Sequence, residues 1–467
     1  MVLREPRPVV FLLFLSAGLG EFAHLLNPKY TPMKITQIRE HTAGIDIGSE
    51  SIFIGLDDDS VHQFGTFTCE FHAAIKLLTG HGVQSIAMES TGVYGVILHE
   101  MLQEAGFEVW LVNPAHLRYV PGRKSDVADC QWLQQLHSYG LLANSFLPDP
   151  AIKALRAYLR LRERYISESS KAVLHMQKAL TLMNIRLHQV ISQIHGASGM
   201  RVLRAILDGE RDPHQLVGLC DKRIQDNKYD QVVASLEGHY RQEYLYELAD
   251  AIDCYEFFQG KLNECDRQID GELSQLAGQQ PIPNDYGKAK PIRHNKPAID
   301  QLHQKVVRAA GGVNANELPG LTDYSALRLM GEVGVDLTPF PNEGHFTSWL
   351  KLAPGKKQSG KRIRTHKYKS APRAAEIFKQ AAQSLLESKN HALGAFGRRV
   401  RARRGPGIAI KAVARKLAIL YYRAMTKGMD YVEQGVEAYE KQYQERRLHM
   451  LHKQASRLGY ALIELNE

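Results

Sequence analysis

The spacing of apolar residues changes at residue 151 of this 467-residue sequence. Before that point, apolar and β-branched runs alternate with stretches of helical spacing. After it, apolar residues recur three and four positions apart from Ile152 to Ile194, and the repeat is broken by Arg162 and Ser169. About six heptads of this kind predict a long coiled-coil helix. The chain is therefore expected to join an α/β domain to an all-α part.

The α/β part covers residues 33–150. Strands are expected at 43–48, 51–56, 61–67, 83–88 and 107–112, and helices at 70–78, 93–105 and 125–139. Three strands followed by helix, strand, helix, strand and helix is the order of a ribonuclease-H-like domain. Because many mixed α/β domains share parts of that order, the order by itself does not decide the fold.

Residues 151–277 are predicted to form a helical arm. A second repeat of the same spacing runs from Leu245 to Leu276, and His195-Gly196 is expected to end the first. The two repeats fit an antiparallel hairpin packed on itself, and they equally fit a dimerisation arm; the two readings are compatible. Residues 278–316 are expected to be a linker with a short helix near 299–309. A compact helical domain follows at 317–430, and a charged helical tail at 431–467.

The N-terminus has a separate character. Arg4 and Arg7 precede an apolar run at 9–19, which resembles the core of a signal peptide but is too short for a membrane span. Patterned sequence begins only after a second methionine, Met33. We therefore expect residues 1–32 to be an over-long start or a dispensable extension, and an export signal is the alternative.

Composition and charge exclude several classes of protein. The sequence is 44% hydrophobic and 23% charged, which is typical of globular proteins rather than disordered, collagen-like or polytopic membrane proteins. Five cysteines without a CxxC pair argue against a structural zinc site or a disulfide framework, and they favour a reducing cytoplasm. The net charge is +9, yet between Lys351 and Arg404 sixteen Lys and Arg face two acids, a local charge of +14. Such a segment predicts a polyanionic partner.

Four carboxylates stand at the ends of the predicted elements. Asp46 ends one apolar strand, in GIDIG, and Glu89 ends another, in IAMESTG. Asp126 and Asp129, in KSDVAD, lie three positions apart and so share one face of a helix. Converging carboxylates need cations, and oxygen-only sites select hard ions such as magnesium, which can activate a nucleophile and stabilise a leaving oxygen at phosphorus. Each acid alone is more often a turn or cap residue.

These motifs carry a family resemblance. GIDIG, AMESTGVYG and FEVWLVNPAHLRYVPGRKSDVADCQWL resemble the RuvC-like domain of the IS110 family of insertion-sequence transposases, DEDD enzymes described as bridge-RNA-guided recombinases. The resemblance continues at LPGLTDYSALRLMGEVG and FTSWLKLAPGKKQSGKR, and it covers most of residues 43–425. It implies that Asp46, Glu89, Asp126 and Asp129 are metal-binding acids. It also implies a structured guide RNA and dimers that pair into a tetramer on DNA.

Residues 318–334 resemble a helix-hairpin-helix element built on Pro319-Gly320. Glycine-tight hairpins at helix N-termini present backbone N–H groups to a phosphate without reading sequence. Gly320 is therefore a predicted nucleic-acid contact, and an ordinary helical turn is the alternative.

Residues 355–362, GKKQSGKR, nearly spell a P-loop, but an arginine replaces the Ser/Thr that would hold magnesium, and no buried strand precedes the motif. We interpret the segment as a flexible basic loop that carries one hydroxyl, Ser359. No neighbouring residue is an obvious base to activate it, so the residues alone indicate a solvated serine. The resemblance instead implies that Ser359 is the nucleophile of the transposase domain. The predicted phosphodiester contacts of this segment are Lys356, Lys357, Lys361, Arg362 and Arg364.

A second basic cluster precedes Gly405-Pro406-Gly407. We expect it to contact the backbone of DNA or RNA, and a solvated turn is the alternative. Its members are Arg398, Arg399, Arg401, Arg403 and Arg404.

The sequence and the resemblance together predict a magnesium-dependent transposase that cuts and rejoins double-stranded DNA without a nucleotide cofactor. Its predicted partners are a guide RNA and further copies of itself, with no membrane association. Two alternatives remain. One is a structure-specific junction nuclease that uses only the acids and forms no covalent enzyme–DNA link. The other is a non-catalytic nucleic-acid-binding protein in which the acids are structural.

Overall fold

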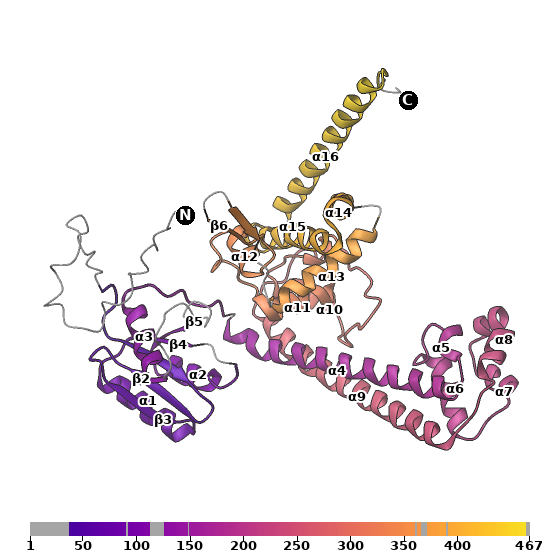
Figure 1. Cartoon of the computed structure of the whole chain (residues 1–467), viewed down its shortest axis with the longest axis horizontal. Helices are drawn as coiled ribbons and strands as arrows, with labels where there is room; N and C mark the ends of the chain where they lie inside the picture. Colours follow the sequence, from indigo (N-terminus) through magenta and orange to yellow (C-terminus); the bar gives the residue numbers. More distant parts are fainter. Residues whose placement is uncertain are drawn as a thin grey trace, which may run out of the picture. The chain divides into compact units, whose positions relative to one another are not determined.

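The computed structural model describes residues 37–89, 92–112, 126–147, 149–359, 362–365, 371–388 and 391–463. It divides the chain into two compact units, Met1–Leu147 and Pro148–Glu467 (Figure 1). Each unit is described by itself. The predicted N-terminal extension, residues 1–32, lies outside the described residues.

The first unit contains a mixed five-stranded sheet. Its strands are β1 (Thr42–Ile47), β2 (Ser51–Gly55), β3 (Val61–Gly65), β4 (Ser85–Glu89) and β5 (Glu108–Val112). They lie in the order β3-β2-β1-β4-β5; β1, β2 and β3 pair antiparallel, whereas β1, β4 and β5 pair parallel. This sheet is consistent with the ribonuclease-H-like domain that the sequence predicts.

Helices cover both faces of this sheet. On one face α1 (Thr68–Gly80) and α2 (Val96–Glu104) pack against strand residues such as Ile45 and Met88, and on the other α3 (Asp126–Ser138) packs through Leu133 against Ala87. Gly44 makes the α3 contact possible, because a Cβ at this position would come 2.1 Å from the carbonyl oxygen of Cys130. The strand pattern thus fixes which residues face α3.

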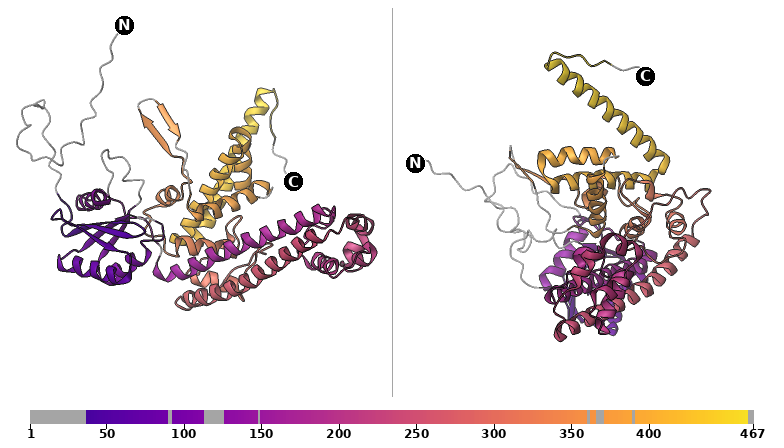
Figure 2. Two further views of the ribbon diagram at one scale, coloured as in Figure 1. Left: turned by 60° about the horizontal axis from the view of Figure 1, so that its bottom comes forward. Right: turned by 90° about the vertical axis from the view of Figure 1, so that its right-hand side faces the viewer.

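The second unit begins with a long pair of helices, α4 (Pro150–Leu182) and α9 (Gln242–Gly278), which lie side by side in both figures (Figure 2). Three contacts show that they run antiparallel: an ion pair between Arg162 and Asp266, a 2.8 Å hydrogen bond between Ser169 and Gln259, and an ion pair between Lys178 and Glu247. The two predicted repeats therefore pack against each other within one chain.

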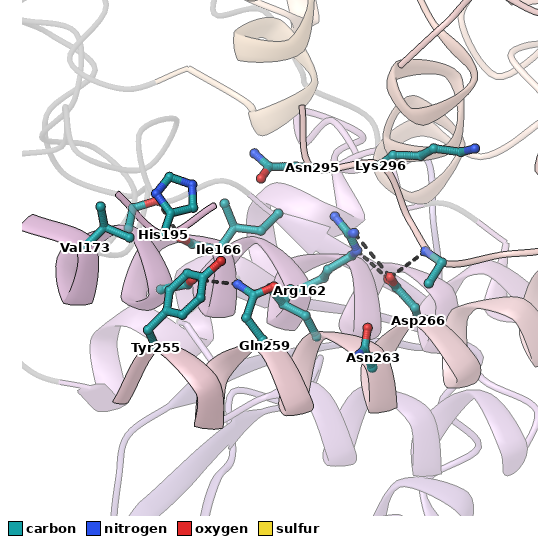
Figure 3. Close-up of a pocket in the computed structure, with 14 residues that line it drawn as sticks. Arg162, Ile166, Val173, His195, Tyr255, Gln259, Asn263, Asp266, Asn295 and Lys296 are labelled. Carbon is teal, nitrogen blue, oxygen red and sulfur yellow. Dashed lines mark hydrogen bonds and ion pairs between the residues drawn. The ribbon is translucent and has the colours of Figure 1, made fainter. Parts of the chain in front are cut away.

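The interruptions of the apolar repeat on α4 line a polar pocket of about 410 Å³ (Figure 3). Arg162 is buried there against Asp266, whose second oxygen also accepts a 2.8 Å hydrogen bond from the backbone N–H of Ala298. Arg162 also donates to the hydroxyl of Tyr324 at 2.9 Å. A buried arginine is tolerated because each of its three guanidinium nitrogens donates to an acceptor.

The prediction of one helix through Ile194 is wrong. Helix α4 ends at Leu182, and Asn184 adopts a left-handed backbone with φ of 57°. The carbonyl oxygen of Met183 accepts a 2.7 Å hydrogen bond from the N–H of His239, which caps the helix end. The later apolar residues belong to a helical head of α5 (Leu187–Val190), α6 (Ala197–Leu207), α7 (Pro213–Gly218) and α8 (Lys222–Leu236). Periodicity cannot separate a straight helix from a chain that turns around the same core.

The rest of the second unit is also mainly helical. It contains α10 (Leu302–Ala309), the 3₁₀ turn η2 (Ala315–Glu317), α11 (Asp323–Val333), α12 (Glu343–Trp349), a hairpin of β6 (Lys356–Ser359) and β7 (Arg362–Thr365), α13 (Arg373–Glu387), α14 (Ala392–Arg404), α15 (Pro406–Lys427) and α16 (Met429–Arg457). Arg156 of α4 donates to the carbonyl oxygens of Gly331 and Glu332, both at 2.8 Å, which ties α11 to the helix pair.

Residues 278–316 pack against neighbouring helices. Ile299 is buried, and Lys290 donates a 2.9 Å hydrogen bond to the carbonyl oxygen of Leu318. In the described part of the chain, no helix is both long and apolar enough to cross a membrane.

Candidate active site

Asp46 and Glu89 occupy neighbouring positions at one edge of the sheet. Parallel pairing sets Ile45 of β1 opposite Met88 of β4, so the next residue on each strand is the acid. Because side chains alternate along a strand, Asp46 shares its face with Gly44 and Glu89 shares its face with Ala87. Both positions lie on the face that α3 covers. Both acids are half-buried.

Asp129 reaches the same region from the second turn of α3. The next residue, Cys130, is affected by the charges of these acids. Burial raises the pKa of the Cys130 thiol to about 11, and the negative charges of Asp46 and Asp129 add to this effect. A thiol with such a pKa stays protonated near neutral pH and is a poor nucleophile. Cys130 is therefore a packing residue, and the charges of both Asp46 and Asp129 act on its thiol.

Asp126 is the first residue of α3, three positions before Asp129, and its side chain lies outside the described residues. Among the described side chains, no three His, Cys, Asp or Glu groups lie close enough together to hold a metal ion. The structure thus brings β1, β4 and the start of α3 to one edge, and the four-acid metal site remains a prediction.

Ser359 does not lie in a flexible loop, and that prediction is wrong. It is the last residue of β6 and pairs with Arg362 of β7 in a short antiparallel hairpin. Next along the ladder, Gln358 pairs with Ile363 and Lys357 with Arg364. Gly360 and Lys361 lie outside the described residues. These two four-residue strands contain a single apolar residue, Ile363, and so give no apolar alternation, which is why the sequence pattern missed them.

Gly320 lies in a turn just before α11, with φ of +75°. A Cβ there would come 3.0 Å from the carbonyl oxygen of Ala381 and 3.0 Å from Cγ of Leu385, so the glycine lets the turn pack on α13. Thr322 caps α11 by accepting from the N–H of Ser325 at 3.3 Å. The predicted phosphate contact at Gly320 stays a prediction.

The five arginines of α14 differ in their contacts. Arg398 is half-buried and donates to the carbonyl oxygens of Leu386 and Ser388 at the end of α13, so it holds two helices together. Arg401 forms a 2.8 Å ion pair with Glu387. The exposed members of the cluster are Arg399, Arg401, Arg403 and Arg404.

Comparison with known families matches both parts of this arrangement. Residues 43–185 match the model of a DEDD transposase of the IS110 type, a range that holds the sheet, Asp46, Glu89, Asp126 and Asp129. Residues 314–397 match the model described as the transposase IS116/IS110/IS902 family, a range that holds the hairpin and Ser359. No curated protein matches the sequence. The two matches, in this order along one chain, identify the protein as a DNA transposase of the IS110 type.

Proposed function

We propose that this transposase cuts and rejoins DNA through a composite site, in which the acids of the first unit act together with Ser359 of the β6–β7 hairpin. The observation that carries the proposal is the adjacency of Asp46 and Glu89 on parallel strands, beneath the helix that supplies Asp129. The family matches support strand transfer on DNA as the overall reaction.

Asp46, Glu89, Asp126 and Asp129 are the residues that would hold a divalent cation. The candidate ligands are carboxylate oxygens, which suit magnesium, and the charges of Asp46 and Asp129, which both raise the pKa of the Cys130 thiol, support an electronegative edge. When bound, magnesium would stabilise negative charge on the oxygens that attack and leave phosphorus. The acids would hold that cation at the edge of the sheet, where its positive charge would offset the repulsion between their carboxylates and the scissile phosphate.

Ser359 supplies the nucleophile in this proposal. Cross-strand partners share a face, and so do alternate residues along a strand, so the hairpin register groups the position of Ser359 with those of Lys357, Arg362 and Arg364. A serine whose register positions are shared by three cationic residues favours a bound phosphodiester. Attack by the Ser359 oxygen forms an oxygen–phosphorus bond as the hydroxyl gives up its proton, and it breaks one bridging phosphorus–oxygen bond. The released oxygen takes up a proton and leaves as a DNA hydroxyl, and reversal of this step rejoins a strand.

The proposed partners are double-stranded DNA, a structured guide RNA and further copies of the chain. The local charge of +14 between Lys351 and Arg404 supports binding to nucleic acid. The guide RNA and the pairing of dimers into a tetramer rest on the family resemblance.

Neutral amides at the acid positions test this function. Asp46→Asn and Asp129→Asn should each lower magnesium-dependent cleavage of an element-end plasmid by at least about 100-fold, because several kcal/mol of charge stabilisation is lost. DNA binding in a gel-shift assay should be nearly unchanged. Asp58→Asn is the matched control, since Asp58 lies in an exposed turn and accepts a 3.0 Å hydrogen bond from the N–H of Ser60.

Full cleavage in the presence of a chelator would contradict the metal-dependent part of the proposal. An equal loss in the Asp58→Asn protein would show that any carboxylate of this unit has the same effect.

A further inference from the structure

The polar pocket beside α4 and α9 has a different chemistry at its two ends (Figure 3). At one end Arg162 forms an ion pair with Asp266, which also accepts from the N–H of Ala298, so both charges are already used. At the other end lie the rings of His195 and Tyr255, with centroids 5.6 Å apart. Asp266 is the only carboxylate among the described residues of the lining. The pocket therefore offers no free negative charge to a cationic ligand.

The two rings at the far end are uncharged. Burial lowers the pKa of His195, so its imidazole is neutral near neutral pH, and burial raises the pKa of Tyr255, so its hydroxyl keeps its proton. Nδ1 of His195 is buried and forms no hydrogen bond with any described residue, which makes Nε2 the ring nitrogen that can meet a ligand. This end thus combines aromatic surface with polar atoms.

Amide groups and one ammonium group complete the polar wall. Gln259 donates from its amide nitrogen to Ser169 at 2.8 Å, and its amide oxygen is a separate acceptor. Asn263 and Lys296 are exposed, and they add a second amide and a positive charge. The apolar part of the lining is made by Ile166, Val173 and Leu262.

A nucleotide is the ligand class that uses all of these groups. Aromatic rings stack on the face of an unpaired base, and Asn or Gln amides form paired hydrogen bonds with a base edge. The ammonium group suits a phosphate. The volume of about 410 Å³ lies within the range of small-ligand pockets. A transposase also has nucleotides at hand, because it acts on DNA.

We propose that this pocket binds one unpaired nucleotide, whose base stacks on Tyr255 with its edge toward Nε2 of His195. The amides of Gln259 and Asn263 contact the same base, and Lys296 contacts its phosphate. A base within a duplex cannot enter, because its faces are covered by its neighbours and its edge is paired. The inference does not depend on the proposed role of the acids.

The test is photocrosslinking of the full-length chain to 5-iodouracil, which joins on irradiation to an aromatic ring that it contacts. The base is supplied as a free nucleoside monophosphate, in a short single-stranded DNA and in a short single-stranded RNA. At least one probe should form an adduct with Tyr255 or His195, mapped by mass spectrometry of the peptides. The probe that does so identifies the source of the nucleotide. The same base paired in a duplex should give about tenfold less adduct.

Asn263→Leu removes one contact to the base from an exposed position, so it should lower the adduct yield at limiting probe about fivefold while leaving the fold intact. Gln268→Leu is the matched control, since Gln268 is an exposed amide of α9 outside the pocket. Tyr246, 75% exposed on the same helix, reports reaction with any accessible ring.

Absence of an adduct in the pocket with every probe would overturn the proposal, and so would an adduct at Tyr246 as strong as that at Tyr255. Equal yields from Asn263→Leu and Gln268→Leu would also overturn it, because the Asn263 amide would then not contact the base. No cleavage is measured and no magnesium is added, so failure of the acid chemistry leaves this result readable.

Discussion

His137 is a fully buried residue at the end of α3 remote from Asp129. Its Nε2 lies 2.8 Å from the hydroxyl of Ser85, which donates to Glu108 at 2.9 Å. Trp110 donates to the other oxygen of Glu108 at 2.9 Å, and its ring lies beneath the guanidinium of Arg39. Burial, and then the positive charge of Arg39, lower the pKa of His137 from 6.5 to about 4. The folded domain therefore keeps this ring neutral.

A pH dependence of stability follows from this shift. Between pH 6.5 and about 4 the unfolded chain binds a proton at His137 that the folded chain does not, so stability falls as the pH is lowered through this window. From pH 7 to pH 5 this residue should contribute a loss of up to about 2 kcal/mol. Urea unfolding of His137→Gln at the two pH values should show a smaller loss than wild type.

Glu108, which faces the same ring, has its pKa lowered from 4.5 by hydrogen bonds from Trp110 and Ser85, so it stays ionised in the folded chain at both pH values of the comparison. Identical pH dependence in wild type and His137→Gln would show that His137 is not the group responsible.

The sequence predicted some of these residues better than others. Asp46 and Glu89 were predictable because an acid that ends an apolar strand must lie at a sheet edge, and parallel strands end at the same edge. The cluster of Ser85, Glu108 and His137 was not, because it joins three elements far apart in the chain.

At the scale of elements, the α4–α9 pair is the clearest result of the apolar repeat. The repeat predicted two long helices but not where the first ends, because the apolar residues after Leu182 keep similar spacing while packing into a separate helical head. The two polar residues that interrupt the repeat on α4 contact polar residues on α9. Arg162 forms an ion pair with Asp266, and Ser169 forms a hydrogen bond with Gln259.

The buried pair of Arg162 and Asp266 should be costly to break from one side. Arg162→Met leaves Asp266 buried without its ion-pair partner and should lower the free energy of unfolding by about 3–5 kcal/mol. The double variant Arg162→Met/Asp266→Leu should lose less than the sum of the two single changes, since no lone charge remains. Urea unfolding of the four proteins gives this coupling.

Lys178→Met is the matched control on the same helix pair. The side chains of Lys178 and Glu247 are exposed and lie 3.6 Å apart, so Lys178→Met should lower the free energy of unfolding by less than about 1 kcal/mol. If the double variant loses as much free energy of unfolding as the two single variants together, the buried pair is not coupled and this account is contradicted.

At the scale of the whole molecule, periodicity and strand order predicted an α/β unit followed by a helical one, and the structure has both. The four acids and Ser359 lie in different units and are more than 200 positions apart in the sequence. No local pattern can show that such groups act together, because that depends on how units and chains assemble. The family matches connect the two parts, since both belong to transposases of one type.

We predict a site shared between two chains, because Ser359 and the acids lie in different units. Mixing Ser359→Ala protein with Asp129→Ala protein would then restore one intact site in some assemblies, since each variant supplies the group that the other lacks. Recovery of partial cleavage in the mixture, with neither variant active alone, would place the two groups of a site on different chains.

The central claim is that Ser359 attacks the scissile phosphate at a site completed by the acids, and a covalent link between protein and DNA tests it most directly. Wild type with magnesium and labelled element-end DNA should yield a denaturant-resistant adduct that a protease removes. Ser359→Ala should yield none and should exchange no strands, and Asp129→Ala, which keeps the serine, should yield little. Strand exchange by Ser359→Ala at the wild-type rate would contradict the claim and leave the acids to act alone as a nuclease.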